Sequence, residues 1–435
     1  MHRLRHPADR EIVRLAFPAL GALAAEPLYL LVDTAVVGHL GTAQLGGLAV
    51  AGTILTTSYF LFNFLAYGTT AAVARATGAG RDDEVASQGA QSMWLALAIG
   101  VALAVVGTAF APHAVRAFGA QGDVAVHAAL YLRVSAIGAP AVLVMLAGAG
   151  FLRGVQDTRT TLLVAVGSNV VNLILEVWLV YGLDRGIGAS AGATVVAQFG
   201  GAIAYAIVVA RRVRAAGAPV RPDLARLRRL VIVGRDLFVR TGALLGALAV
   251  ATAVASRIGD VSLAAHQVAF QLWSFLALVL DAIAIAGQAI VGRALGAGDA
   301  DGARSSSRRM VEWGIAAGLA FTVLILALRP ALAPLFSGDD RVVDAAFEVL
   351  LVVALLQPLN AIVFVLDGVL IGAGDARFLA GAMVASALAF AAAIALVVAL
   401  GGGLIALWGA IAVLMTTRLI GNASRFASGK WAVVG

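Results

Sequence analysis

The sequence repeats itself at an offset of 218 residues without a gap. The residues that recur in register include Gly41 with Gly259, Arg75 with Arg293, Pro112 with Pro330, Pro140 with Pro358, and Asp157 with Asp375. In a chain with only ten prolines, matched prolines and charges at one offset indicate a duplicated unit. The two copies differ at two acidic residues that lie within apolar stretches of the first copy. Asp33 of the first copy corresponds to Ala251, and Glu176 corresponds to Ile394.

The composition indicates an integral membrane protein. Hydrophobic residues make up 61% of the chain and charged residues 13%, whereas soluble domains have about 45–50% and 25%. The chain has no cysteine, which excludes disulfides, thiolate metal sites and thiol nucleophiles. Its net charge of +7 comes from arginines between apolar stretches, which are typical of loops facing anionic lipid rather than of a nucleic-acid-binding surface. We therefore expect the lipid bilayer, and no nucleic acid, as a partner.

Apolar stretches long enough to span a bilayer recur between Gly, Arg and Asp breaks. The predicted spans are 12–38, 47–74, 88–111, 124–152, 160–183, 187–210, 231–256, 264–292, 307–328, 342–371, 377–400 and 403–424. They give an all-α polytopic membrane protein with twelve transmembrane helices, six in each copy. An even number per copy returns the chain to its starting side, so the copies are predicted to be related by a pseudo-two-fold axis along the membrane normal.

The domain prediction places an N-lobe at 1–210, a basic linker at 211–230 and a C-lobe at 231–435. Arginine is rare in every second loop and frequent in the others. The sparse loops contain only Arg116, Arg185, Arg257, Arg329 and Arg341. The positive-inside rule therefore predicts that both termini are cytoplasmic, in a bacterial cytoplasmic membrane. The linker is interpreted as an amphipathic segment on anionic headgroups, with a regulatory lipid-binding arm as the alternative.

Two polar stripes of equal spacing lie in the first copy. Glu26, Tyr29 and Asp33 follow an i, i+3, i+7 pattern, which places them on one helical face. The same spacing recurs elsewhere in the first copy, at Asn169, Asn172 and Glu176. At about 1.5 Å of rise per residue, Asp33 and Glu176 both lie roughly 9–12 Å below the outer ends of their helices. The two carboxyl groups are therefore predicted to share one membrane layer.

Carboxyl groups inside a membrane usually face a bundle interior or water and carry function. A carboxyl group that exchanges a proton near neutral pH would suit an ion-coupling site. The alternative is that Asp33 and Glu176 snorkel to the interface or bond helix backbones. Glu26 also has a local interpretation, because Pro27 removes a backbone donor beside it. Pro18 and Pro27 are predicted to allow this helix to kink, although prolines also occur in membrane helices as packing features.

In the second copy, polar residues fall within two predicted spans. Gln267, Gln271 and Asp281 are predicted to contribute to a substrate cavity, with Asp281 near mid-membrane. The cavity residues predicted in the first copy are Glu26, Tyr29 and Asn169. Asp367 is predicted to act as a structural cap or an inter-lobe contact, and His266 as a solvated interfacial residue. No phosphate-binding loop, H-E-x-x-H or G-x-S-x-G motif is present, so the sequence does not favour an enzyme. No metal or cofactor is predicted apart from H⁺ or Na⁺ as a coupling ion.

Four stretches of the chain form a recognisable pattern: LVDTAVVGHLG at 31–41, FLRGVQDTRTTLL at 151–163, SNVVNLILEVWLV at 168–180 and LDGVLIGAGDAR at 366–377. These stretches resemble the multidrug and toxic compound extrusion (MATE) family, in its DinF-like branch. The resemblance implies two six-helix lobes in a V shape and alternating access. It also implies export of cationic or amphipathic organic compounds in exchange for H⁺ or Na⁺.

The family's functional residues carry over to Asp33, Tyr29 and the Asn172–Glu176 pair, where this branch usually has Asn and Asp. The NorM-like branch carries an acid in its tenth helix, where this chain has Asn360. We therefore predict a monomeric proton-coupled exporter with coupling centred on Asp33. A sodium-coupled exporter, with a possible Na⁺ site at Asp33, Asn172 and Glu176, is the first alternative. A flippase for lipid-linked precursors, a major-facilitator carrier, and a membrane enzyme or receptor are the others.

Overall fold

Glycines with positive φ lie at several of the breaks between helices, and some of them match in register between the two copies. Gly41 has φ 137° and Gly259 has φ 144°, while Gly80 and Gly298 have φ 68° and 80°. These backbone conformations are disfavoured for residues with a Cβ atom. The loops of the two repeats therefore share their local geometry as well as their sequence.

The computed structural model describes residues 7–434, and within them it contains helices and no strand. The first repeat contains α1 (Pro7–Gly38), α2 (Thr42–Leu61), α3 (Phe64–Gly78), α4 (Asp82–Ala117), α5 (Gly122–Ile137), α6 (Ala139–Gly154), α7 (Thr158–Val177), the π-helical turn η1 (Trp178–Gly182) and α8 (Ile187–Ala215). The second repeat contains α9 (Leu224–Ile258), α10 (Asp260–Gly296), α11 (Ala300–Phe336), α12 (Asp340–Gly372), α13 (Ala376–Ala399) and α14 (Leu404–Ala427). The predicted all-α fold is confirmed.

Eleven helices or helix pairs in the described part are long and apolar enough to cross a membrane. A twelfth span arises if α5 and α6, which meet at an angle of 51°, count as one broken span. Pro140 at the start of α6 explains this break, because proline cannot donate the helical hydrogen bond at that point. The structure thus agrees with twelve predicted spans and makes the protein a multi-pass membrane protein.

Contacts group the chain into two compact units. The first unit is Phe17–Gly234, and the second is Arg235–Gly435 with the residues up to Ala16. The predicted N-lobe and C-lobe differ from these units at the beginnings of α1 and α9, each of which packs with helices of the other repeat. The predicted linker at 211–230 is shorter in the structure, because α8 continues to Ala215 and α9 begins at Leu224.

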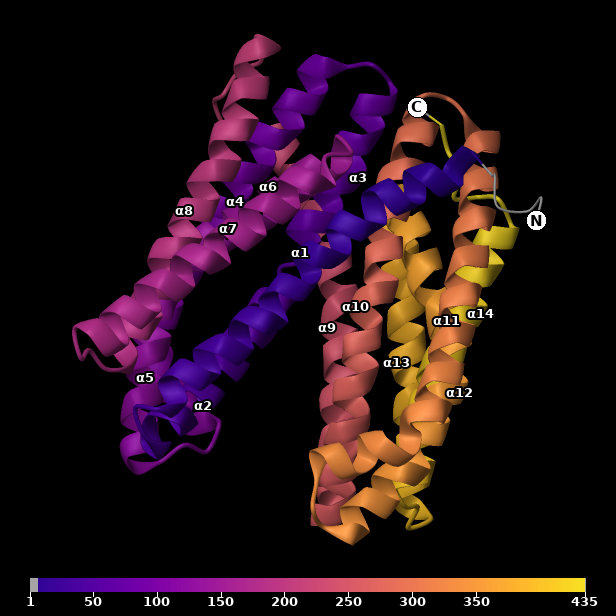
Figure 1. Ribbon diagram of the computed structural model, residues 1–435. Helices are drawn as coiled ribbons and strands as arrows, with labels where there is room; N and C mark the ends of the chain where they lie inside the picture. The colour runs from indigo at the N-terminus through magenta and orange to yellow at the C-terminus, as the bar shows by residue number, and fades with distance from the viewer. Residues whose placement is uncertain (1–6, 435) are drawn as a thin grey trace. The chain divides into compact units, whose positions relative to one another are not determined.

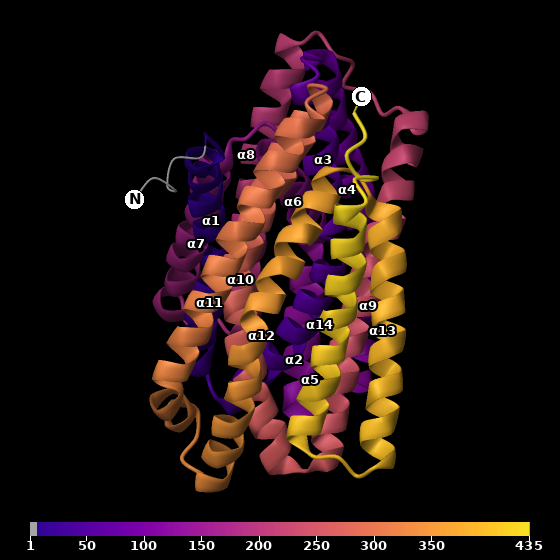
Figure 2. The ribbon, with the colours of Figure 1, turned by 90° about the vertical axis from the view of Figure 1, so that its right-hand side faces the viewer.

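Small residues let helix backbones approach closely within each unit. In the second unit, α12 packs beside α10, α11 and α14 (Figures 1 and 2). A Cβ atom on Gly368 of α12 would lie 2.4 Å from the Ala284 carbonyl oxygen of α10. In the first unit, a Cβ atom on Gly150 of α6 would lie 2.5 Å from the Ala66 carbonyl oxygen of α3. Glycine at these positions is therefore what allows the helices to pack in contact.

Candidate functional site

Polar side chains from four helices meet inside the first unit. Asp33 comes from α1, Tyr131 from α5, Glu176 from α7 and Ser190 from α8. Asp33 is 1% exposed and Glu176 is 0% exposed. We call these four residues the carboxyl cluster. The predicted meeting of Asp33 and Glu176 in one layer is therefore found in the fold, although the carboxyl groups are bridged by a serine that the sequence did not reveal.

Ser190 is the centre of the carboxyl cluster. Its hydroxyl oxygen lies 2.9 Å from Asp33 Oδ1 and 2.8 Å from Glu176 Oε1. Tyr131 donates a hydrogen bond of 3.1 Å to Asp33 Oδ2. No arginine or lysine of the described chain forms an ion pair with Asp33 or Glu176. Two buried carboxyl groups without a counter-cation favour binding of a positive charge between them.

The other residues predicted around Asp33 lie at different distances from the carboxyl cluster. The Tyr29 hydroxyl bonds to Thr194 Oγ1 at 2.8 Å, and Thr194 donates to the Ser190 carbonyl. Asn172 is buried and donates a long hydrogen bond of 3.5 Å to Glu176 Oε2. Tyr29 thus reaches Ser190 through Thr194 and also interacts with Tyr131 of the carboxyl cluster, whereas Asn172 contacts Glu176.

Asn169 and Glu26 have other surroundings. The Asn169 amide donates to the Ala25 carbonyl of α1 at 2.7 Å, so this residue joins α7 to α1. Pro27 and Pro18 both lie inside α1, which runs without interruption from Pro7 to Gly38. Glu26 is exposed. The predicted stripe on α1 therefore divides into a buried Asp33, a half-buried Tyr29 and an exposed Glu26.

The backbone changes its helical repeat directly after Glu176. The α-helix α7 ends at Val177 and continues as the π-helical turn η1. Turns of this kind are rare and occur frequently at functional sites. Tyr181 within this turn donates to the Val36 carbonyl of α1 at 3.3 Å. The turn therefore connects the helix that carries Glu176 to the helix that carries Asp33.

The second unit has an apolar core where the first unit has the carboxyl cluster. The repeat counterparts of Asp33, Tyr131, Glu176 and Ser190 are, in order, Ala251, Val349, Ile394 and Trp408. All four counterparts are buried in one hydrophobic core of the second unit. The difference between the repeats thus extends beyond the two acids to the residues that hold them.

The predicted cavity residues of the second repeat belong to the second unit. Gln267 and Gln271 are exposed on α10. Asp281 is half-buried and interacts electrostatically with Arg418 of α14. Asp281 therefore already faces a cation of the protein within the second unit.

Asp367 belongs to a buried ionic network that the sequence analysis missed. Its carboxylate accepts hydrogen bonds of 2.5 Å from both Arg240 of α9 and Arg418 of α14, and one of 2.7 Å from Asn422. All four residues belong to the second unit. Asp367 is therefore tied to its own unit, in agreement with a structural role. Arginines within predicted apolar spans were the available signal, because such residues need a buried partner.

His266 is not the solvated interfacial residue that its position predicts. It is 1% exposed, its Nε2 atom bonds to Thr252 Oγ1 at 3.2 Å, and its ring packs on Phe270 and Trp408. The packing of α9, α10 and α14 around it covers the helix end that a count along the sequence places at the surface.

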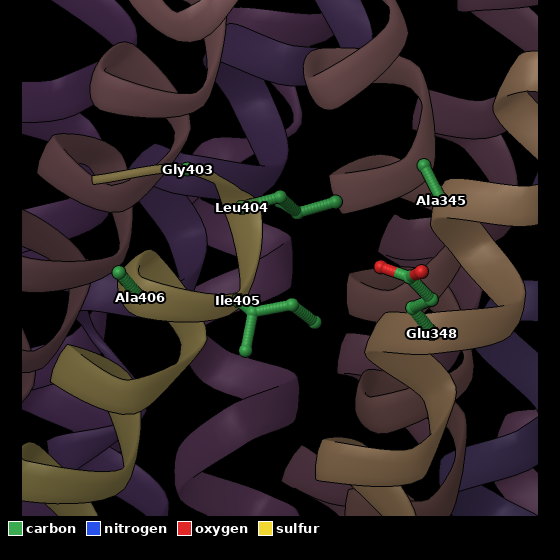
Figure 3. A pocket seen from close by; sticks show the side chains of 6 residues that line it. All are labelled: Ala345, Glu348, Gly403, Leu404, Ile405 and Ala406. Atoms are coloured by element: carbon green, nitrogen blue, oxygen red, sulfur yellow. The ribbon is translucent and has the colours of Figure 1, made fainter. Parts of the chain in front are cut away.

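A small hollow of about 250 Å³ opens in the second unit between α12 and the start of α14. Its lining is Ala345, Glu348 and residues 403–406, with the Glu348 carboxylate facing Leu404 and Ile405 (Figure 3). This hollow has one charged group and lies in a different unit from the carboxyl cluster. The carboxyl cluster therefore remains the candidate functional site.

Comparison with known proteins identifies the family. The family model described as MatE matches residues 18–178 and 244–397, which is most of the chain. The chain belongs to the MATE family. It is 32% identical to the chloroplastic protein DETOXIFICATION 44 of Arabidopsis thaliana, over 97% of this chain and 83% of that protein. It is 30% identical to DNA damage-inducible protein F of Escherichia coli, over 94% of this chain and 90% of that protein, in agreement with the DinF-like branch.

Solved structures of MATE proteins have the same fold. A MATE structure in the bent conformation matches with a TM-score of 0.87 at 21% identity, covering 98% of this chain and 97% of that one. An outward-facing multidrug resistance MATE transporter matches with a TM-score of 0.86 at 22% identity, covering 98% and 97%. The predicted two-lobe, twelve-helix fold class is thus confirmed. As a MATE family member, the protein is an efflux transporter and not an enzyme.

Proposed function

We propose that this MATE protein is a proton-coupled antiporter that exports cationic or amphipathic organic compounds, with coupling centred on Asp33. The observation that supports this proposal is the burial of Asp33 and Glu176 around one serine hydroxyl without a counter-cation. Two like charges this close to each other favour uptake of a positive charge. A proton or a cationic substrate would each satisfy that requirement, which makes them competitors.

The geometry at Ser190 suits a cluster that holds one proton. The serine hydroxyl has a single hydrogen, so it donates to only one of the two carboxyl oxygens within reach. A hydrogen bond to the other carboxyl group requires a proton on that carboxyl group. The arrangement is therefore complete when one of Asp33 and Glu176 is protonated, and it lacks a hydrogen when both are ionised.

A transport cycle follows from competition for this cluster. When the carboxyl cluster is deprotonated, its negative charge attracts an organic cation. Protonation from the opposite side of the membrane removes that charge and favours release of the cation. Coupling requires that the two ligands bias the same structural element, and α1, which carries Asp33 and two internal prolines, is that element in our proposal.

Sodium is the second candidate for the coupling ion. The observation in its favour is Asn172 Oδ1, a buried acceptor beside Glu176 that has no hydrogen-bond partner. Sodium takes oxygen ligands, and carboxylate, amide and hydroxyl oxygens all occur within this group of residues. The chemistry of these oxygens therefore fits a small cation as well as a proton.

Reconstitution into sealed proteoliposomes tests the proposal. A fluorescent organic cation is followed while either a pH gradient or a sodium gradient is imposed. We expect the pH gradient to drive transport at constant sodium, and Asp33→Asn to insert normally but to lose that transport. Transport driven only by sodium would transfer the assignment to the second candidate. Normal pH-driven transport by Asp33→Asn would contradict the role of Asp33.

We place the protein as a monomer in a bacterial cytoplasmic membrane, with both termini in the cytoplasm. The distribution of arginines among the loops supports this orientation.

A further inference from the structure

The N-terminal end of α1 is held by helices of the second repeat. Asp9 accepts hydrogen bonds from Arg309 of α11 at 2.6 and 2.9 Å and from Trp313 Nε1 at 2.9 Å. Two residues further along α1, Glu11 pairs with Arg293 of α10 at 2.8 Å. Ile12, the next residue of α1, is 1% exposed. We call Asp9, Arg309 and Trp313 the α1 clamp.

The first turn of a helix normally uses an acidic residue to stabilise its own free amide groups. The carboxylate of Asp9 is instead engaged by a two-bond arginine contact and an indole N–H from residues 300 and 304 positions away. Both the Asp9 and the Arg309 side chains are only about one-sixth exposed or less. Such a charged, bidentate and largely desolvated contact fixes geometry more strongly than a surface ion pair.

The start of α9 is held in a corresponding way by α4 of the first repeat. Gln91 donates to the Arg221 carbonyl at 3.0 Å and accepts from the Asp223 amide at 2.8 Å. Trp94 donates to the Val220 carbonyl at 2.7 Å. These bonds engage backbone groups and include no ion pair between α4 and the segment that they hold. We call Gln91 and Trp94, with the backbone they bind, the α9 clamp.

One residue of each clamp matches in the repeat, whereas the other members of the clamps do not. Gln91 and Arg309 are separated by the repeat offset, and so are the unit boundaries after Ala16 and after Gly234. Each repeat therefore begins with a helix whose first turns pack in the other repeat's unit. The helices differ in what they carry further along, because α1 carries Asp33 whereas α9 carries Ala251 at the same register.

We propose that the α1 clamp is a fixed anchor through which the state of the carboxyl cluster acts on the second unit. This inference rests on the proposed coupling at Asp33. The clamp holds the start of α1 in the second unit, while Asp33 holds the end of α1 in the first. A change at Asp33 is then transmitted along one continuous helix, and Pro18 lies directly after the unit boundary, where the helix can bend. Asp9, Arg309 and Trp313 are positioning residues, not ligands for the ion or the substrate.

Neutralising the clamp tests the proposal. We expect Asp9→Ala to lower pH-driven transport about tenfold or more, with substrate affinity in detergent unchanged. Arg309→Ala should cause at least the same loss, because it also removes an ion pair with Glu312. The loss in the double variant should be smaller than the sum of the two single losses, because both substitutions break the Asp9–Arg309 contact. The matched control is Asp301→Ala, which removes an exposed ion pair to Arg304 on the same helix and should leave transport unchanged. The proposal would be overturned if Asp9→Ala transported at the wild-type rate, or if the loss of transport in the double variant were the sum of the two single losses.

A covalent replacement separates a fixed anchor from a gate. The chain has no cysteine, so Asp9→Cys with Arg309→Cys can be joined by a short bis-methanethiosulfonate reagent. The unbridged double variant should transport slowly, and the bridge should restore transport because the clamp stays closed throughout the cycle. Loss of the remaining transport on bridging, recovered on reduction, would show that the clamp must open and would refute the fixed anchor.

Proton release on substrate addition in detergent distinguishes this inference from the proposed function. The wild-type protein and Asp9→Ala should both release protons, whereas Asp33→Asn should not. If the wild type releases none, proton coupling at Asp33 fails, whatever the clamp variants do. If it does release protons and Asp9→Ala transports normally, only the anchor fails.

Discussion

At the scale of single residues, the hydroxyl group of Ser190 links the two acids of the carboxyl cluster. Its hydroxyl joins two buried carboxyl groups on different helices, and its repeat counterpart Trp408 is part of an apolar core. A hydroxyl group at this position therefore serves the polar cluster and not the architecture that both repeats share.

We predict that Ser190→Ala inserts and folds but transports about five- to hundredfold more slowly. Removal of the hydroxyl leaves buried carboxyl oxygens without a partner, which costs about 1–3 kcal/mol. The measurement is the initial rate of pH-driven transport in proteoliposomes. Ser58→Ala, which removes only a bond to the Ile54 carbonyl of its own helix, is the control and should transport at the wild-type rate.

Asp367 offers a prediction about stability. Asp367→Ala leaves Arg240 and Arg418 buried without their shared carboxylate, and breaking a buried pair from one side costs about 3–5 kcal/mol. We expect a clear fall in the thermal unfolding temperature in detergent. Arg341→Ala, which removes an exposed pair with Asp339 and leaves Asp339 as the N-cap of α12, should change that temperature little. Equal stability of the two variants would contradict the structural role of the network.

The sequence predicted the acids of the carboxyl cluster but not their partners. Asp33 and Glu176 stand out because charge inside an apolar span is rare, and their helical spacing placed them in one layer. Tyr131 and Ser190 carry no such signal, because hydroxyl residues are common in membrane helices and only the packing of α5 and α8 brings them to Asp33. Arg240 and Arg418 could have been predicted to have a buried acidic partner, because both lie inside predicted spans.

At the scale of helices, α6 depends on small residues along two faces. Gly150 contacts the backbone of α3, and Gly148 contacts the Tyr205 ring of α8. The ends of the spans could be predicted from Gly, Arg and Asp residues. Some of the breaks inside the spans could not be predicted. The break before α6 was marked by Pro140, whereas the one between α2 and α3, at Phe62 and Asn63, has no proline or glycine.

We predict that Gly150→Ala destabilises the protein. The added methyl group would lie 2.5 Å from the Ala66 carbonyl oxygen, so α3 and α6 must move apart, and overpacking of this kind costs about 1–3 kcal/mol. Thermal unfolding in detergent measures the loss. The matched control is Gly192→Ala on α8, where the methyl group meets no atom within 4 Å and should stabilise the helix slightly. A Gly150→Ala protein as stable as this control would show that the helices adjust without cost.

At the scale of the whole molecule, the membrane orientation gives a prediction that labelling can check. Arg81→Cys and Arg341→Cys each introduce the chain's one thiol at an exposed position, on opposite predicted sides. A membrane-impermeant maleimide added to intact cells should label position 341 and not position 81, with both labelled after permeabilisation. The reverse pattern would place the termini outside, against the distribution of arginines.

The two units are alike in fold and unlike in chemistry. The repeat predicted their common architecture, and the differences within it predicted where the acids lie. The repeat did not predict that the first turns of α1 and α9 each pack in the unit formed by the other repeat. In the sequence, both helices are uninterrupted spans of their own repeat. Only contacts such as Asp9 with Arg309 reveal it.

The position of the α1 clamp has a consequence for biosynthesis. Asp9 leaves the ribosome 300 residues before its partner Arg309. At about 5–20 residues per second, the first helix waits roughly 15–60 s for the residues that bind it. The α9 clamp has no such delay, because α4 is complete before α9 is made. A nascent chain therefore inserts its first helix with the start of that helix unsecured, and the α1 clamp cannot close before α11 has been made.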